Sequence, residues 1–343
     1  MKLSLFSTLR GYRKEYLPKD IFSGIIIAAV SIPISMGYAQ ISGIPAVYGL
    51  YGSVLPILLF ALFSTSRQFI FGVDAAPAAI VGGALSTLGI AAESEAAMDY
   101  VPAIALFAGL WLFIFFLLHA DKIVDFISTP VMGGFISGIA VTIILMQIPK
   151  LMGSPAGSGE LLELAGHIFA AAKTISWLSL FMGLGALVLI RTFKKLAPKF
   201  PMAIVIMALG VLSTVVFHVD EKGVVLLQSV ERGLPSLMIP DFGNVDLTQA
   251  AGRGLMVAVV IMAETLLAEN TFAFRNDYKL NDRQEILACA AGNIAAAAVG
   301  CCPVNGSISR TSLNEQYGGK SQAVSITAGI TMALILLFGT GFI

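Results

Sequence analysis

Long stretches without a single charged residue are the feature that most constrains the fold of this chain. No Asp, Glu, Lys or Arg occurs in residues 21–66, 126–149 or 321–343. Charged residues make up only 12% of the chain, against about 25% in ordinary soluble domains. Each uncharged run is long enough to cross a bilayer as a helix, which takes roughly 20 residues. We therefore predict an all-α polytopic protein embedded in a lipid bilayer.

Apolar runs separated by polar or Gly/Pro-containing turns indicate eleven spans. They are expected at residues 20–40, 46–64, 76–90, 99–119, 128–149, 174–191, 201–218, 251–270, 284–300, 307–316 and 321–341. The third and the tenth are the short ones, because a complete membrane helix needs roughly 20 residues. We interpret these two as half-helices.

The two short spans lie in interrupted segments at matching places in the two halves of the chain. The first is STSRQFIFGVDAAPAAI at 64–80, and the second is GCCPVNGSISRTSL at 300–313. Paired interruptions of this kind point to the binding site of a transporter built from inverted repeats. With seven spans in each repeat, the second repeat begins near Asp246. Only four spans then follow, so we expect the last three of fourteen to be missing.

Lys and Arg are distributed unevenly between the loops on the two sides. With a cytoplasmic N-terminus, fifteen of them fall in cytoplasmic loops and five outside, and the stretch 191–199, RTFKKLAPK, is the strongest anchor. Cytoplasmic loops are enriched in Lys and Arg. We therefore predict a cytoplasmic N-terminus in a plasma membrane, such as the bacterial inner membrane. This threading brings the two short spans in from opposite sides, as an inverted repeat requires.

Several function classes are disfavoured by composition. The net charge is zero, which gives no basic surface for nucleic acid. The cysteines, Cys289, Cys301 and Cys302, form no CxxC and no Cys/His metal spacing. No span holds a Ser/His, Asp/Asp or HExxH arrangement, so we predict neither an enzyme nor a metal centre. The sequence indicates no cofactor apart from a coupling Na⁺ or H⁺.

Six longer motifs carry a resemblance to a known family. They are IPISMGYAQISGIPAVYGLY at 32–51, STSRQFIFG at 64–72, STPVMGGFISGIAVTIILMQIPKLMG at 128–153, ERGLPSLMIP at 231–240, DYKLNDRQEILACAAGNIAAAAVG at 277–300 and PVNGSISRTSLNEQYGGKSQ at 303–322. Together they resemble the sulfate permease (SulP) family, which includes pendrin and prestin. The last two motifs are the most specific.

The resemblance implies a uracil-permease-like fold of fourteen spans in two inverted sevens, followed by a cytoplasmic STAS domain. It divides this chain into core residues 1–122, gate residues 123–245 and core residues 246–343. The remaining gate spans and the STAS domain are expected to be absent. The implied function is secondary active transport of a small anion (sulfate, bicarbonate, chloride or a dicarboxylate) by alternating access, coupled to H⁺ or Na⁺. Family members commonly form homodimers.

The predicted anion site lies where the N-termini of the two half-helices face each other. Such ends offer unpaired N–H groups and a partial positive charge. The expected donors are the backbone N–H groups around Ala75, Ala76, Ser307, Ile308 and Ser309. The hydroxyl groups of the two serines either join the site or only cap the helix.

Arg310 is the one basic residue between positions 283 and 320, and the resemblance places it near the anion. The alternative is a structural pair with a carboxylate such as Glu264. Glu264 lies within the eighth span, where family members carry an acidic residue implicated in proton or sodium coupling. Ionisable residues inside spans are usually functional. Glu269, nearer the cytoplasmic end, is expected to be solvated.

Asp74 departs from the family pattern, in which a small or apolar residue is common at this position. It either caps the following helix or binds a proton or Na⁺ together with the substrate, which is the interpretation we favour. Tyr38 occupies the position of an aromatic residue that the family places beside the anion, although it could equally be a packing residue. Ile34 stands where relatives often carry Gln. Asn293 and Asn314 are expected to satisfy helix breaks.

Two alternative functions stay open. A nucleobase permease shares the fold and a Glu in the eighth span, but it would be expected to carry acidic or amide side chains in the tenth. An uncoupled exchanger, channel or motor is the other, and Asp74 and Glu264 argue against it.

Overall fold

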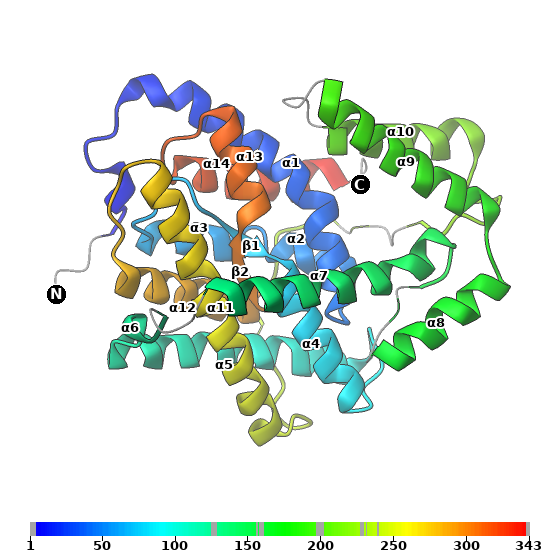
Figure 1. The fold of residues 1–343 in the computed structure, drawn as a ribbon, viewed down its shortest axis with the longest axis horizontal. Helices are drawn as coiled ribbons and strands as arrows, with labels where there is room; N and C mark the ends of the chain where they lie inside the picture. The colour runs from blue at the N-terminus through cyan, green and yellow to red at the C-terminus, as the bar shows by residue number, and fades with distance from the viewer. Residues whose placement is uncertain are drawn as a thin grey trace.

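The computed structural model describes residues 5–124, 129–155, 157, 161–196, 202–226, 230, 232–238 and 240–340. Helices dominate these residues (Figure 1). The α-helices are α1 (Leu17–Ile41), α2 (Ala46–Tyr51), α3 (Leu55–Phe63), α4 (Ala75–Thr87), α5 (Glu95–Leu118), α6 (Asp121–Val124), α7 (Thr129–Leu151), α8 (Leu161–Lys173), α9 (Trp177–Leu196), α10 (Met202–Phe217), α11 (Leu247–Arg275), α12 (Asp282–Ala298), α13 (Ile308–Tyr317) and α14 (Ala323–Leu334). Short 3₁₀ turns precede α1 at Ser7–Leu9 and Lys14–Tyr16, and a π-helical turn, Ile335–Gly339, follows α14.

By length and composition, four helical stretches of the described chain could each cross a membrane. They are Lys14–Ile41, Ala46–Phe63, Glu95–Leu118 and Leu247–Arg275. A fifth is added if α8 and α9, which are bent by 117° at their junction, count as one broken span. The protein is therefore an integral membrane protein, and the figure of eleven spans stays a prediction.

Several helices differ from the predicted spans. The second span is two helices, α2 and α3, because the chain turns at 52–54, where a side chain on Gly52 would collide with Cys301. The third span is α4, which begins one residue earlier than predicted and ends at Thr87. Helix α8 was not predicted. Its apolar residues follow the helical period, but at 13 residues it is shorter than a span.

A short antiparallel ladder corrects the all-α prediction. Strands β1 (Ile70–Val73) and β2 (Val304–Ser307) pair with each other, with Ile70 opposite Ser307 and Val73 opposite Val304. All of their residues are buried. Away from water, backbone N–H and C=O groups that leave a helix need partners. The two interrupted segments satisfy this need by pairing with each other, which a prediction from each segment alone misses.

The ladder also sets the directions of two helices. Helix α4 continues from the Val73 end of β1, and α13 continues from the Ser307 end of β2. Because the strands are antiparallel, the helices leave the ladder at opposite ends and run in opposite directions (Figure 1). Both N-termini consequently face the ladder.

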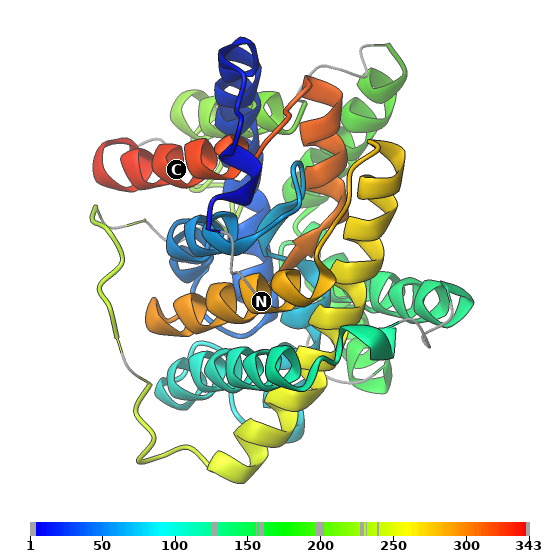
Figure 2. The same ribbon diagram turned by 90° about the vertical axis from the view of Figure 1, so that its left-hand side faces the viewer.

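Helices from the two ends of the chain surround this ladder. Helix α12 packs against α5 and α3, α11 packs against α5, and α1 packs against α14 and α2. Figure 2 shows α5 and α12 lying one above the other with α11 crossing both. Small residues allow the close approach, since a side chain on Gly109 would meet the backbone of α12 at Ile294.

Helices α8, α9 and α10 lie to one side of this assembly (Figure 1). Their outer surfaces carry exposed apolar side chains, including Phe169, Phe181, Val188 and Val215. Exposed apolar side chains of this kind suit contact with lipid or with other apolar helices. The division into core residues 1–122 and 246–343 and gate residues 123–245 stays a prediction.

Candidate anion site

Arg310 spans the ladder from the first turn of α13 to the start of α4. Its side chain is buried, with 2% exposed, and its Nη2 donates a hydrogen bond to the carbonyl of Val73 at 2.7 Å. Its Nη1 lies 3.4 Å from the hydroxyl of Ser31 on α1. The Nε–H group has no hydrogen-bond partner in the described part of the chain. A full positive charge is thus held beside the two helix N-termini.

Gly72 allows the guanidinium to lie across β1. A side chain at this position would bring its Cβ 3.0 Å from Arg310 Nη1, a tighter approach than carbon and nitrogen tolerate without movement. Its φ of +158° is also rarely adopted by other residues. Glycine is therefore needed here both for the backbone and for the space that the arginine occupies.

Asp74 is the ion-pair partner of Arg310. Its Oδ2 lies 3.7 Å from Arg310 Nη2, and its Oδ1 accepts a hydrogen bond from the N–H of Ala75 at 2.7 Å. The residue therefore caps α4, as the capping interpretation predicted. The alternative pairing of Arg310 with Glu264 is not made. The Asp74 side chain stays 18% exposed, so small ions can reach it.

The start of α13 is open. Ser307 occupies the N-cap position without making a side-chain cap hydrogen bond, and its Oγ lies 3.3 Å from Oγ of Ser309. Ile308 and Ser309 are exposed, in contrast to the buried Ser307. Capping therefore does not use up the serine hydroxyl groups.

Glu264 reaches the ladder from α11. Its Oε2 accepts a hydrogen bond from Nδ2 of Asn305 on β2 at 2.6 Å, while Asn305 Oδ1 accepts one from the hydroxyl of Thr265 at 2.7 Å. Glu264 and Asp74 lie within electrostatic range of each other. Glu264 is half-buried.

The remaining predicted site residues are Tyr38 and the first residues of α4. Tyr38 lies within electrostatic range of Asp74 and Arg310, and it also packs against a small buried apolar cluster that includes Ala78. Ala76 is buried and Ala75 is half-buried at the first turn of α4. The predicted residues therefore lie along the ladder and at the two helix starts at its opposite ends.

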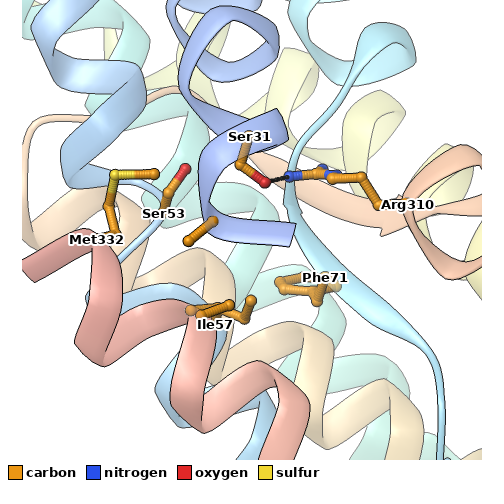
Figure 3. Close-up of a pocket in the computed structure, with 8 residues that line it drawn as sticks. Ser31, Ser53, Ile57, Phe71, Arg310 and Met332 are labelled. Carbon is orange, nitrogen blue, oxygen red and sulfur yellow. Dashed lines mark hydrogen bonds between the residues drawn. The ribbon is translucent and has the colours of Figure 1, made fainter. Parts of the chain in front are cut away.

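A cavity just large enough for about one water molecule adjoins Arg310. It is lined by residues from α1, α3, α14, β1 and the turn before α3. Figure 3 shows the Arg310 side chain running towards Ser31, with Ser53 and Met332 at the other end of the lining. Its small size leaves no room for a polyatomic anion.

The family of the chain is identified by a sequence model. The model of the "Sulfate permease family" matches residues 17–343. The chain belongs to the sulfate permease family. A "Probable sulfate transporter" of Mycobacterium tuberculosis is 27% identical to it over 335 residues, covering 97% of this chain and 60% of that protein. "Sulfate transporter 4.1, chloroplastic" of Arabidopsis thaliana is 30% identical over 348 residues, covering 98% and 50%.

Solved structures share the fold of this sulfate permease family member. The structure of SLC26A9 superposes with a TM-score of 0.84 at 18% identity, covering 96% of this chain and 55% of that chain. The transmembrane domain of a cyanobacterial bicarbonate transporter, BicA, gives 0.83 at 19% identity, covering 96% and 85%. The chain spans between half and two thirds of the length of the curated relatives named above. Family and neighbours are transporters, which bears out the prediction that the chain is not an enzyme.

Buried amides, which the sequence only partly indicated, hold the ladder of this permease in place. Asn293 on α12 donates to the carbonyl of Val304 at 3.0 Å and accepts from its N–H at 2.9 Å. Asn314 on α13 donates to the carbonyl of Gln68 at 2.7 Å. The prediction that both asparagines satisfy breaks is confirmed. Gln322, which was not singled out, donates to the carbonyls of Ser66 and Phe69.

Thr311 was also not predicted from the sequence. Its hydroxyl accepts from the N–H of Ile70 at 3.0 Å and donates to the carbonyl of Ser307 at 2.6 Å. It thereby joins the start of β1 to the end of β2. The signal that could have found it is a hydroxyl residue four positions after the strand end, within a polar helix start.

The structure corrects the prediction made for Glu269. The sequence predicted a solvated residue near the cytoplasmic end of its span, but the side chain is fully buried. The reason is tertiary, because Glu285 on α12, which accepts a hydrogen bond from Ser64, lies beside Glu269.

Proposed function

We propose that this chain forms the substrate-binding part of a secondary active transporter of small anions. The anion is held at the N-termini of α4 and α13, beside Arg310. The single observation that carries this proposal is the buried guanidinium of Arg310, fixed between two helix starts that face the same ladder.

The electrostatics of the site favour a small anion. Each helix N-terminus contributes about half a positive charge, and Arg310 adds a full one, which Asp74 offsets in part. Backbone N–H groups around Ala75, Ala76, Ser307, Ile308 and Ser309 supply donors. Anions with several oxygen atoms, such as sulfate or bicarbonate, match such a set of donors. The Arabidopsis relative is named a sulfate transporter and BicA a bicarbonate transporter, and these names support this substrate class for the chain.

Asp74 and Glu264 are the proposed coupling residues. With both carboxylates ionised, an arriving anion meets two negative charges beside Arg310, which raises the cost of its entry. A proton or Na⁺ bound at these carboxylates removes that repulsion. Anion and cation then bind best together, which is the thermodynamic requirement for symport.

We further propose an alternating-access cycle for the complete protein. The ladder, α4 and α13 move with the helices that pack on them, against α7, α9 and α10. The protein lies in the plasma membrane with its N-terminus in the cytoplasm and assembles as a homodimer.

Anion binding by the purified chain tests the proposal. Sulfate, bicarbonate, chloride and a small dicarboxylate are titrated by calorimetry in detergent, with and without Na⁺ and at two pH values, and uracil serves as the comparison ligand. We expect at least one anion to bind, and to bind more tightly with Na⁺ or at lower pH. Binding that ignores Na⁺ and pH would indicate uncoupled exchange, and binding of uracil alone would indicate a nucleobase permease.

A further inference from the structure

A second acidic site lies on α11 just beyond the residues that contact the ladder. Glu269 is fully buried, and neither of its carboxylate oxygens has a hydrogen-bond partner in the described chain. An ionised carboxylate in this state would pay a large desolvation cost with nothing to offset it. The side chain must therefore carry a proton or hold a cation.

Glu285 on α12 is the neighbour of Glu269, and the two carboxyl groups interact directly. Glu285 is also fully buried, yet it is well supplied with donors. Ser64 donates from its hydroxyl at 2.8 Å, and Thr65 donates from its backbone N–H at 2.5 Å and from its hydroxyl. Glu285 also lies in the first turn of α12, where the helix dipole favours a negative charge.

Neither glutamate forms an ion pair in the residues that the structure describes. The other titratable groups that face them are Asp282, Tyr278 and Cys289. The arginines of the adjoining segments are engaged elsewhere. Arg67 lies over the ring of Tyr278, and Arg283 lies over the ring of Phe116 while donating to its carbonyl.

We propose that Glu269 and Glu285 bind one proton between them at neutral pH, with the proton carried by Glu269 and donated to the ionised Glu285. With one proton, the carboxyl group of Glu269 becomes a hydrogen-bond donor, and Glu285 accepts that hydrogen bond. Glu285 keeps the negative charge, because three donors and a helix N-terminus already stabilise it.

This proton site is separate from the coupling residues of the proposed function. Glu269 follows Glu264 by five residues, which places it about 7.5 Å further along α11 and rotated by roughly 140°. The two glutamates therefore lie on different faces of the same helix. The acidic pair instead joins α11 and α12 to residues 64–66, the segment that leads into β1.

Loss of the proton would leave two adjacent buried carboxylates without a counter-ion. Like charges in such surroundings repel strongly, so α11 and α12 would be driven apart at the point where they hold the segment before β1. The pair thus makes the folded state sensitive to alkaline pH, independently of any bound anion.

Infrared spectroscopy and thermal unfolding of the full chain in detergent, without substrate, test the proposal. Wild type should show the carbonyl band of a buried protonated carboxyl group at neutral pH, and Glu269→Gln should lose that part of the band. The amide of this variant still donates to Glu285, so its melting temperature should stay constant from mildly acidic to alkaline pH while that of wild type falls by several degrees. The exposed Glu221 supplies the control, Glu221→Gln, which should behave as wild type.

Two results would overturn the proton site. One is a Glu269→Gln variant that keeps the full carboxyl band or the wild-type fall in melting temperature. The other is a wild type that shows no such band and is stabilised by added Na⁺, which would make the pair a sodium site. If Glu269→Gln does not fold, measurements on the wild-type protein alone test the proposal. An alkaline titration that removes the carboxyl band in step with unfolding supports the proposal, and a band unaffected by that titration contradicts it.

Discussion

Arg310 and Asp74 link the first turns of two helices that belong to opposite ends of the chain, with Arg310 Nη2 3.7 Å from Asp74 Oδ2. The pair crosses the β ladder, so it holds α13 and α4 in a fixed relationship. Buried ion pairs contribute little net stability, because desolvation of the charges cancels much of their attraction. The role of the Arg310–Asp74 pair is to place a positive charge beside two helix N-termini.

Replacing Arg310 with Lys should weaken anion binding. Lysine keeps the charge but cannot donate to Val73 and reach Ser31 at the same time, because it lacks the planar fork of the guanidinium. We expect the dissociation constant for sulfate to rise by about tenfold or more, equivalent to roughly 1.4 kcal/mol. Calorimetric titration measures it. The same change at the exposed Arg191, Arg191→Lys, should leave binding unaltered, and an equal loss in both variants would argue against a local role.

Asp74→Asn should remove most of the dependence of anion binding on Na⁺ and pH. The amide keeps a side-chain oxygen to accept the N–H of Ala75 but carries no charge to be neutralised. We expect the variant to bind the anion at alkaline pH about as well as wild type binds it at acidic pH. Titrations at two pH values with and without Na⁺ measure this. Asp220→Asn, at an exposed position, is the control, and unchanged wild-type behaviour of Asp74→Asn would exclude the coupling role.

Gly72→Ala should destabilise the protein and weaken anion binding together. The new methyl group lies against Arg310 Nη1, and the backbone conformation is strained for alanine, which costs about 1–3 kcal/mol. Gly83→Ala in α4 is a matched control, since a Cβ there meets nothing within 4 Å and a Gly-to-Ala change inside a helix is usually favourable. Thermal unfolding in detergent should rank Gly72→Ala below wild type and Gly83→Ala at or above it. The reverse order would refute the steric explanation.

Asn293→Ala should loosen the ladder without touching the anion. The change leaves the N–H and C=O groups of Val304 buried and unpaired, at a cost of about 1–3 kcal/mol for each. We expect a lower melting temperature and faster hydrogen exchange at β1 and β2. Replacement of the exposed Asn244, Asn244→Ala, should change neither, and normal protection of the ladder in Asn293→Ala would show that other contacts hold β2.

The positions of the main helices followed from the sequence, because long apolar runs have few alternatives in a bilayer. Helix α5 lies at Glu95–Leu118 against a predicted 99–119, and α11 at Leu247–Arg275 against 251–270. The ladder did not follow, since neither VNGS nor IFGV is a convincing strand by itself. Each becomes a strand only because the other supplies its hydrogen-bond partners, more than two hundred residues away.

For the site, the sequence identified the charged residues but not their partners. Arg310 and Asp74 lie next to helix breaks and Glu264 lies inside an apolar span, so these charged residues stand out from their uncharged surroundings and could be singled out. Whether Arg310 pairs with Asp74 or Glu264 depends on the path of its side chain over Gly72, which only the folded backbone defines.

The sequence by itself determined a helical membrane protein with two interrupted segments and their charged neighbours, because hydrophobicity and charge are properties of each residue. The tertiary structure alone decided that those segments pair as strands, that Arg310 joins Asp74, and that Glu269 is buried. Pairing and burial depend on which distant segments meet, and backbone groups away from water must find their partners among those segments.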